Sequence, residues 1–166
     1  MKIITDKQEA LELIKKEPSI LLLCSDELQN DRGFILEVVG QNGKALEYVS
    51  EKLRADREIV LTAVGDNGWA LGYASRELRS DKEVVLKAVK QNGVSLQYAS
   101  EELRADREVV LTAVKRYGEA LEYASYELRN NNEVVTEAVK TTSWALQYAS
   151  RQLQNAIDKF NQLTLK

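Results

Sequence analysis

The sequence of 166 residues predicts an all-α protein, an α-solenoid (superhelix) of about six 25-residue two-helix repeats with terminal caps. Three observations predict this fold. Residue types recur at steps of 25, apolar residues within each step follow helical spacing, and an acidic residue precedes the second helix of most steps. Repeats of 20–50 residues are typical of solenoids, in which neighbouring units bury a shared core. We therefore expect residues 1–166 to form a single repeat domain.

The 25-residue step is visible in columns of identical residues. Leucine recurs at positions 21, 46, 71, 96, 121 and 146, serine at 25, 50, 75, 100, 125 and 150, and tyrosine at 48, 73, 98, 123 and 148. Glycine occupies 43, 68, 93 and 118, and Ser143 replaces it once. These columns predict five full repeats over residues 21–145.

The unit Leu96–Ala120 shows why each repeat is expected to hold two helices. Its leucines and alanines fall at i, i+3 and i+7, and its valines follow at the same helical period. Asp106 is a suitable N-cap, and Gly118 suits the left-handed position after a helix. We expect helices over about 98–104 and 107–116. Leucine-rich repeats are the alternative at this length, but the unit lacks their Leu-x-Leu strand alternation.

Both ends of the chain keep the register in altered form. Asp6 precedes the aspartate column by 25 residues, so residues 1–20 are expected to form an N-terminal capping half-repeat. At the other end Ala156 replaces the capping aspartate, and residues 146–166 are expected to form a C-terminal partial capping repeat. Terminal units of solenoids are usually atypical because one face meets water.

Composition excludes several chemistries. The chain has no histidine and one cysteine, which removes the commonest general base and any multi-cysteine zinc site. We therefore expect no catalytic residues, no cofactor and no metal, and hence a protein that is not an enzyme. The longest apolar run, residues 20–24, is too short to span a membrane, and no signal peptide is visible. A lone thiol fits a cytoplasmic location.

The repeated polar and aromatic columns have structural explanations. The tyrosines are interpreted as half-buried core rings rather than as a platform for nucleobases. The arginines at 54, 79, 104 and 129 are expected to form ion pairs within or between units rather than a phosphate-binding stripe. The serines are expected to lie inside helices and to bond the carbonyl four residues back. Cys24 shares a column with Val49 and Ala74, so a core thiol is expected.

The variable columns are the better candidates for binding. The position after the glycine reads Lys44, Trp69, Val94, Glu119 and Trp144, which indicates solvent exposure. Trp69, Trp144, Tyr117 and Tyr126 are the aromatics least explained by packing. Exposed aromatics are typical interface anchors, so these four are the candidate partner-binding residues. The alternative is that the two tryptophans only cover a turn.

These features favour a non-catalytic scaffold that binds another protein or a peptide. One alternative is a nucleic-acid-binding helical repeat, but the net charge of −3 makes nucleic acid an unfavoured partner. Another is a purely structural module of a longer repeat protein. We expect no membrane partner, and a monomer or a weak dimer.

The repeat also resembles a known family. The segment Asp81-x-Glu83-Val-Val-Leu-x-Ala-Val-x-x-x-Gly93-x-Ser-Leu-x-Tyr-Ala-Ser100, continuing to Leu103-Arg104, is similar to the repeat of domain of unknown function 4116. That family's units are drawn as pairs of the 25-residue step. Units 46–70 and 96–120 share 17 of 25 residues, whereas 46–70 and 71–95 share 13. The resemblance covers residues 21–153 and implies the architecture, with no known activity.

Leu78 belongs to a core column of the predicted solenoid. We expect Leu78→Ala to lower the free energy of unfolding by roughly 2–5 kcal/mol, because the side chain leaves a cavity between units. Thermal denaturation measures this loss. A melting temperature equal to that of the wild type would show that the register is wrong.

Overall fold

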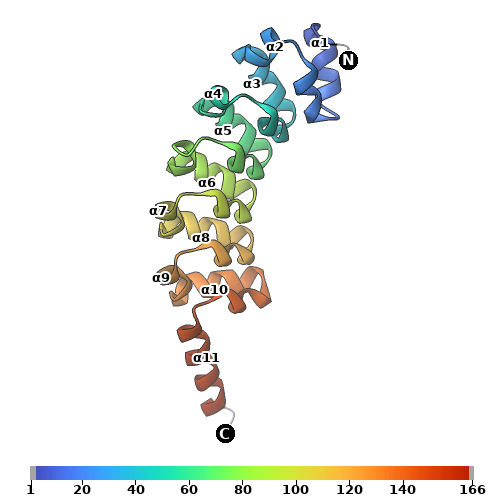
Figure 1. The fold of residues 1–166 in the computed structure, drawn as a ribbon. Coiled ribbons are helices and arrows are strands. Elements are labelled where there is room, and N and C mark those ends of the chain that lie inside the picture. Colours follow the sequence, from blue (N-terminus) through green and yellow to red (C-terminus); the bar gives the residue numbers. More distant parts are fainter. Residues whose placement is uncertain (1–2, 165–166) are drawn as a thin grey trace.

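The computed structural model describes residues 3–164, and the side chains of residues 3–157, as a single stack of helical units (Figure 1). The expected all-α tandem repeat is confirmed. Within the described backbone, β-type pairing is limited to an isolated bridge between Ile4 and Cys24. The core runs continuously through the stack, because the buried side chains of all units form one hydrophobic cluster.

Ten-residue α-helices form the centre of the stack. They are α3 (Arg32–Gln41), α5 (Arg57–Asp66), α6 (Lys82–Gln91), α8 (Arg107–Arg116) and α10 (Asn132–Thr141). Each packs against the next in this order. The helix expected over 107–116 is confirmed. The expected N-caps are also confirmed: the carboxylate of Asp81 accepts from the amides of Glu83 and Val84, and the other units repeat this arrangement.

The rest of each unit consists of a six-residue 3₁₀ helix and a short second segment. The 3₁₀ helices are η1 (Pro18–Leu23), η2 (Gly43–Tyr48), η3 (Gly68–Tyr73), η5 (Gly93–Tyr98), η6 (Gly118–Tyr123) and η7 (Ser143–Tyr148). The short segments are α2 (Asp26–Asn30), α4 (Glu51–Arg54), η4 (Leu78–Ser80), α7 (Glu101–Arg104) and α9 (Tyr126–Arg129). The 3₁₀ helices stack on one another as the long helices do, so each unit contributes one layer.

The prediction of a continuous helix over 98–104 is wrong. The chain is extended at Ala99 and Ser100, between η5 and α7. The amide of Ser100 donates to the carbonyl of Arg79 in the preceding unit, at 3.0 Å, instead of to a helical carbonyl. The serine column is therefore not inside helices, as expected from the sequence: the hydroxyl of Ser100 accepts from the amide of Leu103 and caps α7.

The role expected for the glycine column is also wrong. None of the described glycines has a positive φ, so Gly93 does not supply a left-handed turn. Instead it begins η5 and lies against the next unit: a Cβ at Gly93 would come within 2.3 Å of the carbonyl oxygen of Ala113. Gly43 and Gly118 show the same contact, at 2.3 and 2.2 Å, with the alanine 20 residues ahead. The column is glycine because two backbones meet there.

The two ends of the stack differ. At the N-terminal end α1 (Lys7–Ile14), capped by Asp6, packs against α3. At the C-terminal end α11 (Arg151–Thr164) is one helix that projects from the stack (Figure 1). A capping aspartate would end the short segment and start a new helix, and Ala156 has no carboxylate to do so. Residues 1–2 and 165–166 of the expected caps lie outside the described residues.

A ladder of ion pairs joins successive units at the N-termini of the long helices. Arg57 contacts Asp81 at 2.9 Å and Glu83 at 2.5 Å, one unit ahead. Arg32 and Lys82 make the equivalent two pairs with the unit that follows each of them, and Arg107 pairs with Glu133 alone. The hydrogen bond from Arg57 holds the pKa of the Asp81 carboxyl below its usual range. Because the cations of these pairs are about half exposed, each pair contributes little to stability alone.

The close glycine contact predicts opposite effects at two glycines. Gly93→Ala should lower the free energy of unfolding by about 1–3 kcal/mol, because its Cβ meets a backbone carbonyl that cannot move aside cheaply. Gly40→Ala in α3 is the matched control: its Cβ would make ordinary contact with Cγ2 of Thr62 at 3.6 Å, and the substitution should stabilise the protein by about 0.5–1 kcal/mol. Urea denaturation followed by circular dichroism measures both values. Equal effects of the two substitutions would contradict the contact.

Candidate functional site

A repeating backbone contact forms the grooves that we regard as the candidate site. At four successive unit boundaries, a serine amide donates to the carbonyl of an arginine in the preceding short segment, at 2.8–3.0 Å: Ser75 to Arg54, Ser100 to Arg79, Ser125 to Arg104 and Ser150 to Arg129. The tyrosine two residues before each serine is thereby held next to that arginine. The contact brings the arginine and tyrosine columns together on one face of the stack.

Two of the resulting grooves are equivalent. Glu51, Arg54, Tyr73, Ala74 and Ser75 line a groove of about 260 Å³. The same residue types, each 50 positions later, line a groove of about 220 Å³: Glu101, Arg104, Tyr123, Ala124 and Ser125. Each groove therefore offers one cation, one anion, one aromatic ring and small residues. The repetition over 50 residues means that the surface has the period of a pair of units.

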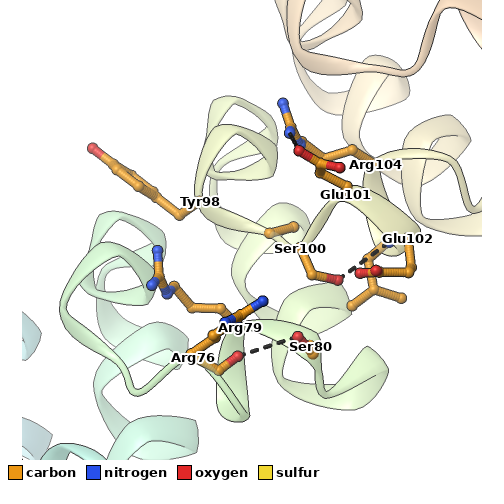
Figure 2. A pocket seen from close by; sticks show the side chains of 10 residues that line it. Arg76, Arg79, Ser80, Tyr98, Ser100, Glu101, Glu102 and Arg104 are labelled. Carbon is orange, nitrogen blue, oxygen red and sulfur yellow. Dashed lines mark hydrogen bonds and ion pairs between the residues drawn. The ribbon is translucent and has the colours of Figure 1, made fainter.

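A larger groove of about 670 Å³ lies between these two, and Figure 2 shows it. Arg76 stands in the column that Glu51 and Glu101 occupy in the neighbouring units. With Arg79 and Arg104 it gives this central groove three arginines, against the two glutamates Glu101 and Glu102. In Figure 2 the side chains of Arg76 and Tyr98 point to the same side. The central groove is therefore the most basic of the three.

Neighbouring residues fix the ring of Tyr98 in the central groove. Trp69 packs edge-on against it, with the ring centres 5.9 Å apart and the planes at 68°. Gly72 leaves space for the ring, since a Cβ there would lie 3.0 Å from its Cε1. The position equivalent to Gly72 is Glu47 in the preceding unit and Gln97 in the following one. The tyrosines at 48, 98, 123 and 148 are half-buried against the core, which confirms their expected packing role. Tyr73 is the exception in this column, since it is 36% exposed.

The ion pairs expected for the arginines at 54, 79, 104 and 129 are not formed as predicted. Among the described residues only Arg104 lies within 4 Å of a carboxylate, at 3.9 Å from Glu101. The Nε atoms of all four are buried and have no hydrogen-bond partner in the described part of the chain. The cations that do join units lie one column further on, at Arg32, Arg57, Lys82 and Arg107. The groove arginines are therefore not required for the ladder.

The four predicted aromatic anchors do not form one cluster. All are exposed: Trp69 by 42%, Tyr117 by 40%, Tyr126 by 53% and Trp144 by 58%. Trp69 adjoins the central groove because its ring contacts that of Tyr98. Tyr126 occupies, two units later, the position equivalent to Arg76. Tyr117 precedes η6 and packs under the guanidinium of Arg116, 5.8 Å from its centre. Trp144 lies on η7, and η5 and η6 separate it from the helix of Trp69.

Outside the three grooves, the features that could carry a function are the thiol of Cys24, metal-ligand clusters, membrane-spanning helices and one apolar groove. Cys24 is buried, its thiol pKa is raised by burial, and it packs in the core as expected. Over the described residues no three His, Cys, Asp or Glu side chains are grouped as metal ligands. None of the described helices has the length and apolar character needed to cross a bilayer. An apolar groove of about 350 Å³ lies between α10 and α11, lined by Val135, Val139, Leu146 and Leu153 among others.

The arginine and tyrosine columns are visible in the sequence, but their proximity in the grooves is not, because it depends on a contact between units. Arginine and tyrosine each recur every 25 residues, and the tyrosine follows the arginine by 19 in every unit. The sequence assigns the tyrosines to packing and the arginines to ion pairs, so Arg79 and Tyr98 are not among the predicted anchors, and neither is Arg76. The signal that could have found them is Arg76 itself, which stands between Glu51 and Glu101 in its column.

Comparison with known proteins gives one match. The profile of a family described as domain of unknown function (DUF4116) matches residues 6–54, 56–104 and 106–154. Each matched segment begins at the N-cap of a long helix, or at Asp6 before α1, and contains two 25-residue units. This is the same pairing that the two equivalent grooves show. No curated protein and no solved structure matches the chain.

Proposed function

Because this chain belongs to the DUF4116 family across three tandem segments, we propose that it is a non-catalytic scaffold that binds a protein or peptide partner along its grooved face. The observation that carries this proposal is the recurrence of the same five groove residues after 50 positions. A surface that repeats with the period of the fold suits an elongated partner, since each pair of units meets the partner in the same way.

The composition of the grooves supports a protein or peptide as the partner. Each narrow groove pairs one arginine with one glutamate beside a tyrosine ring. Tyrosine and arginine are enriched in protein interfaces, where a ring supplies contact area and a guanidinium supplies directed hydrogen bonds. The exposed aromatics are part of the proposal as anchors distributed along the stack: Trp69, Trp144, Tyr117 and Tyr126. We place the protein in the cytoplasm, which the free buried thiol of Cys24 supports.

Nucleic-acid binding is the second candidate, and the central groove is the observation that favours it. Tyrosine rings beside guanidinium groups can stack on bases and contact phosphates. Against it, glutamates line all three grooves, and the net charge of the chain is −3. A phosphate backbone is charged at every nucleotide, so its phosphates would meet these carboxylates as well as the arginines, and we rank this function below protein binding.

The anchor role of the tryptophans predicts a differential result in affinity capture. The immobilised wild-type chain should retain a partner from lysate of its source cell that the Trp69→Ala/Trp144→Ala variant retains about tenfold less. The physical reason is that truncating an exposed aromatic anchor removes much of the binding energy of an interface. Quantitative mass spectrometry of the two eluates measures the difference.

Leu22→Ala is the matched control for this experiment, because Leu22 is an exposed apolar residue, by 57%, at the other end of the stack. Circular dichroism checks that all variants remain folded. The same partners in equal amounts on the wild type and the double variant would contradict the anchor role. A wild-type eluate indistinguishable from that of bare resin would contradict the scaffold itself.

A further inference from the structure

We infer that the central groove is a subsite for a carboxylate, and that the partner is an extended peptide segment with acidic side chains about every third residue. This inference rests on the proposed scaffold function and names the chemical class of its partner. It starts from the contrast between two sets of cations. The cations of one set are paired with protein carboxylates, whereas two of the three arginines that line the central groove are not.

The cations of the ladder are already paired. Arg57 and Lys82 each contact two carboxylates of the following unit at 2.5–2.9 Å. In contrast, Arg76 and Arg79 have no ion pair within 4 Å among the described residues, although both line the central groove. A guanidinium presents five N–H donors in a planar fork that matches a carboxylate. Two unpaired guanidiniums in one groove are therefore suited to an incoming carboxylate.

The repeat sets the spacing of the proposed partner. Arg54, Arg79 and Arg104 occupy one column of three consecutive units, and the long helices α5, α6 and α8 of these units pack side by side. Packed helices lie roughly 8–10 Å apart. A peptide extended in the polyproline II conformation advances about 3.1 Å per residue with three residues per turn, so side chains three residues apart lie on one face. An extended chain that runs along the stack thus covers one unit in about three residues. Acidic side chains at this interval would meet one arginine per unit.

The sequence around the groove distinguishes a specific site from general attraction. The chain as a whole has a net charge of −3, so an acidic peptide is repelled at long range. The central groove is a local exception, because Arg76 replaces the glutamate of its column. The ring of Tyr98, fixed by Trp69, lies at the same groove and can contact the apolar part of the peptide. Binding that survives the unfavourable net charge has to come from this local arrangement.

Fluorescence anisotropy with synthetic peptides tests the inference on the full chain. The probe is a labelled peptide of five Glu-Ser-Gly repeats. One control peptide replaces every glutamate by glutamine, and a second places all five glutamates together at one end. A labelled fifteen-residue oligothymidylate is the nucleic-acid arm. We expect measurable binding of the Glu-Ser-Gly peptide, and at least about tenfold weaker binding of both control peptides.

Protein variants locate the binding. Arg76→Gln/Arg79→Gln should weaken binding of the Glu-Ser-Gly peptide about tenfold, because it removes both unpaired guanidiniums. Lys90→Gln/Lys115→Gln is the matched control: it changes the net charge equally, at exposed positions on α6 and α8, and should leave binding unchanged. Arg76→Gln alone, at an exposed position, gives the same direction of change if the double arginine variant does not fold.

The outcomes separate this inference from the proposed function. No binding of the Glu-Ser-Gly peptide, equal binding of the clustered peptide, or no effect of the arginine substitutions would overturn the inference. Tighter binding of the oligothymidylate, lost in the same arginine variant, would assign the groove to nucleic acid instead. Partner capture that depends on Trp69 and Trp144, together with failure of the acidic peptide, would retain the scaffold and reject only the carboxylate subsite.

Discussion

A glycine in each inner unit lies against the backbone of the unit that follows, and the rest of the stack depends on this contact. Gly43, Gly68, Gly93 and Gly118 each stand where a Cβ would come within 2.2–2.6 Å of an alanine carbonyl. The approach brings the 3₁₀ helix of one unit onto the long helix of the next, so the leucines and valines of both share one core. Ser143 breaks the column in the unit after which α11 projects from the stack.

The grooved face follows from the same packing. Each unit has a serine in the extended break between its 3₁₀ helix and its short segment. Once two units are this close, the amide of this serine donates to an arginine carbonyl of the preceding unit. The bond fixes the arginine beside the next tyrosine, and repetition produces a row of grooves rather than a single pocket. The framework is constant, and single substitutions such as glutamate to Arg76 set the charge of each groove. Recognition can therefore vary along the row without change to the fold.

The sequence predicts those features that depend on neighbouring residues in the chain. The aspartate caps and the helix over 107–116 are local, and both are confirmed. The break at Ser100 is not local, because the acceptor for its amide, the carbonyl of Arg79, belongs to another unit. The contact that requires glycine at position 93 is likewise with another unit, at the carbonyl oxygen of Ala113. The arginines were assigned to ion pairs because carboxylates follow closely in sequence, but those carboxylates pair with the cations of the next column. Of the predicted anchors, Trp69 contacts a ring that lines the central groove, that of Tyr98.

Hydrogen exchange of individual amides tests the contact between units most directly. The amides of Gly43 and Gly68 donate across the unit boundary to Asp66 and to Gln91, at 2.8 and 2.7 Å. Both begin 3₁₀ helices, where an amide in an independent unit would meet water. Nuclear magnetic resonance on the intact chain should show these two amides protected to the same degree as amides inside α5 and α6. Exchange at the rate of exposed loops, while the long helices remain protected, would contradict the account.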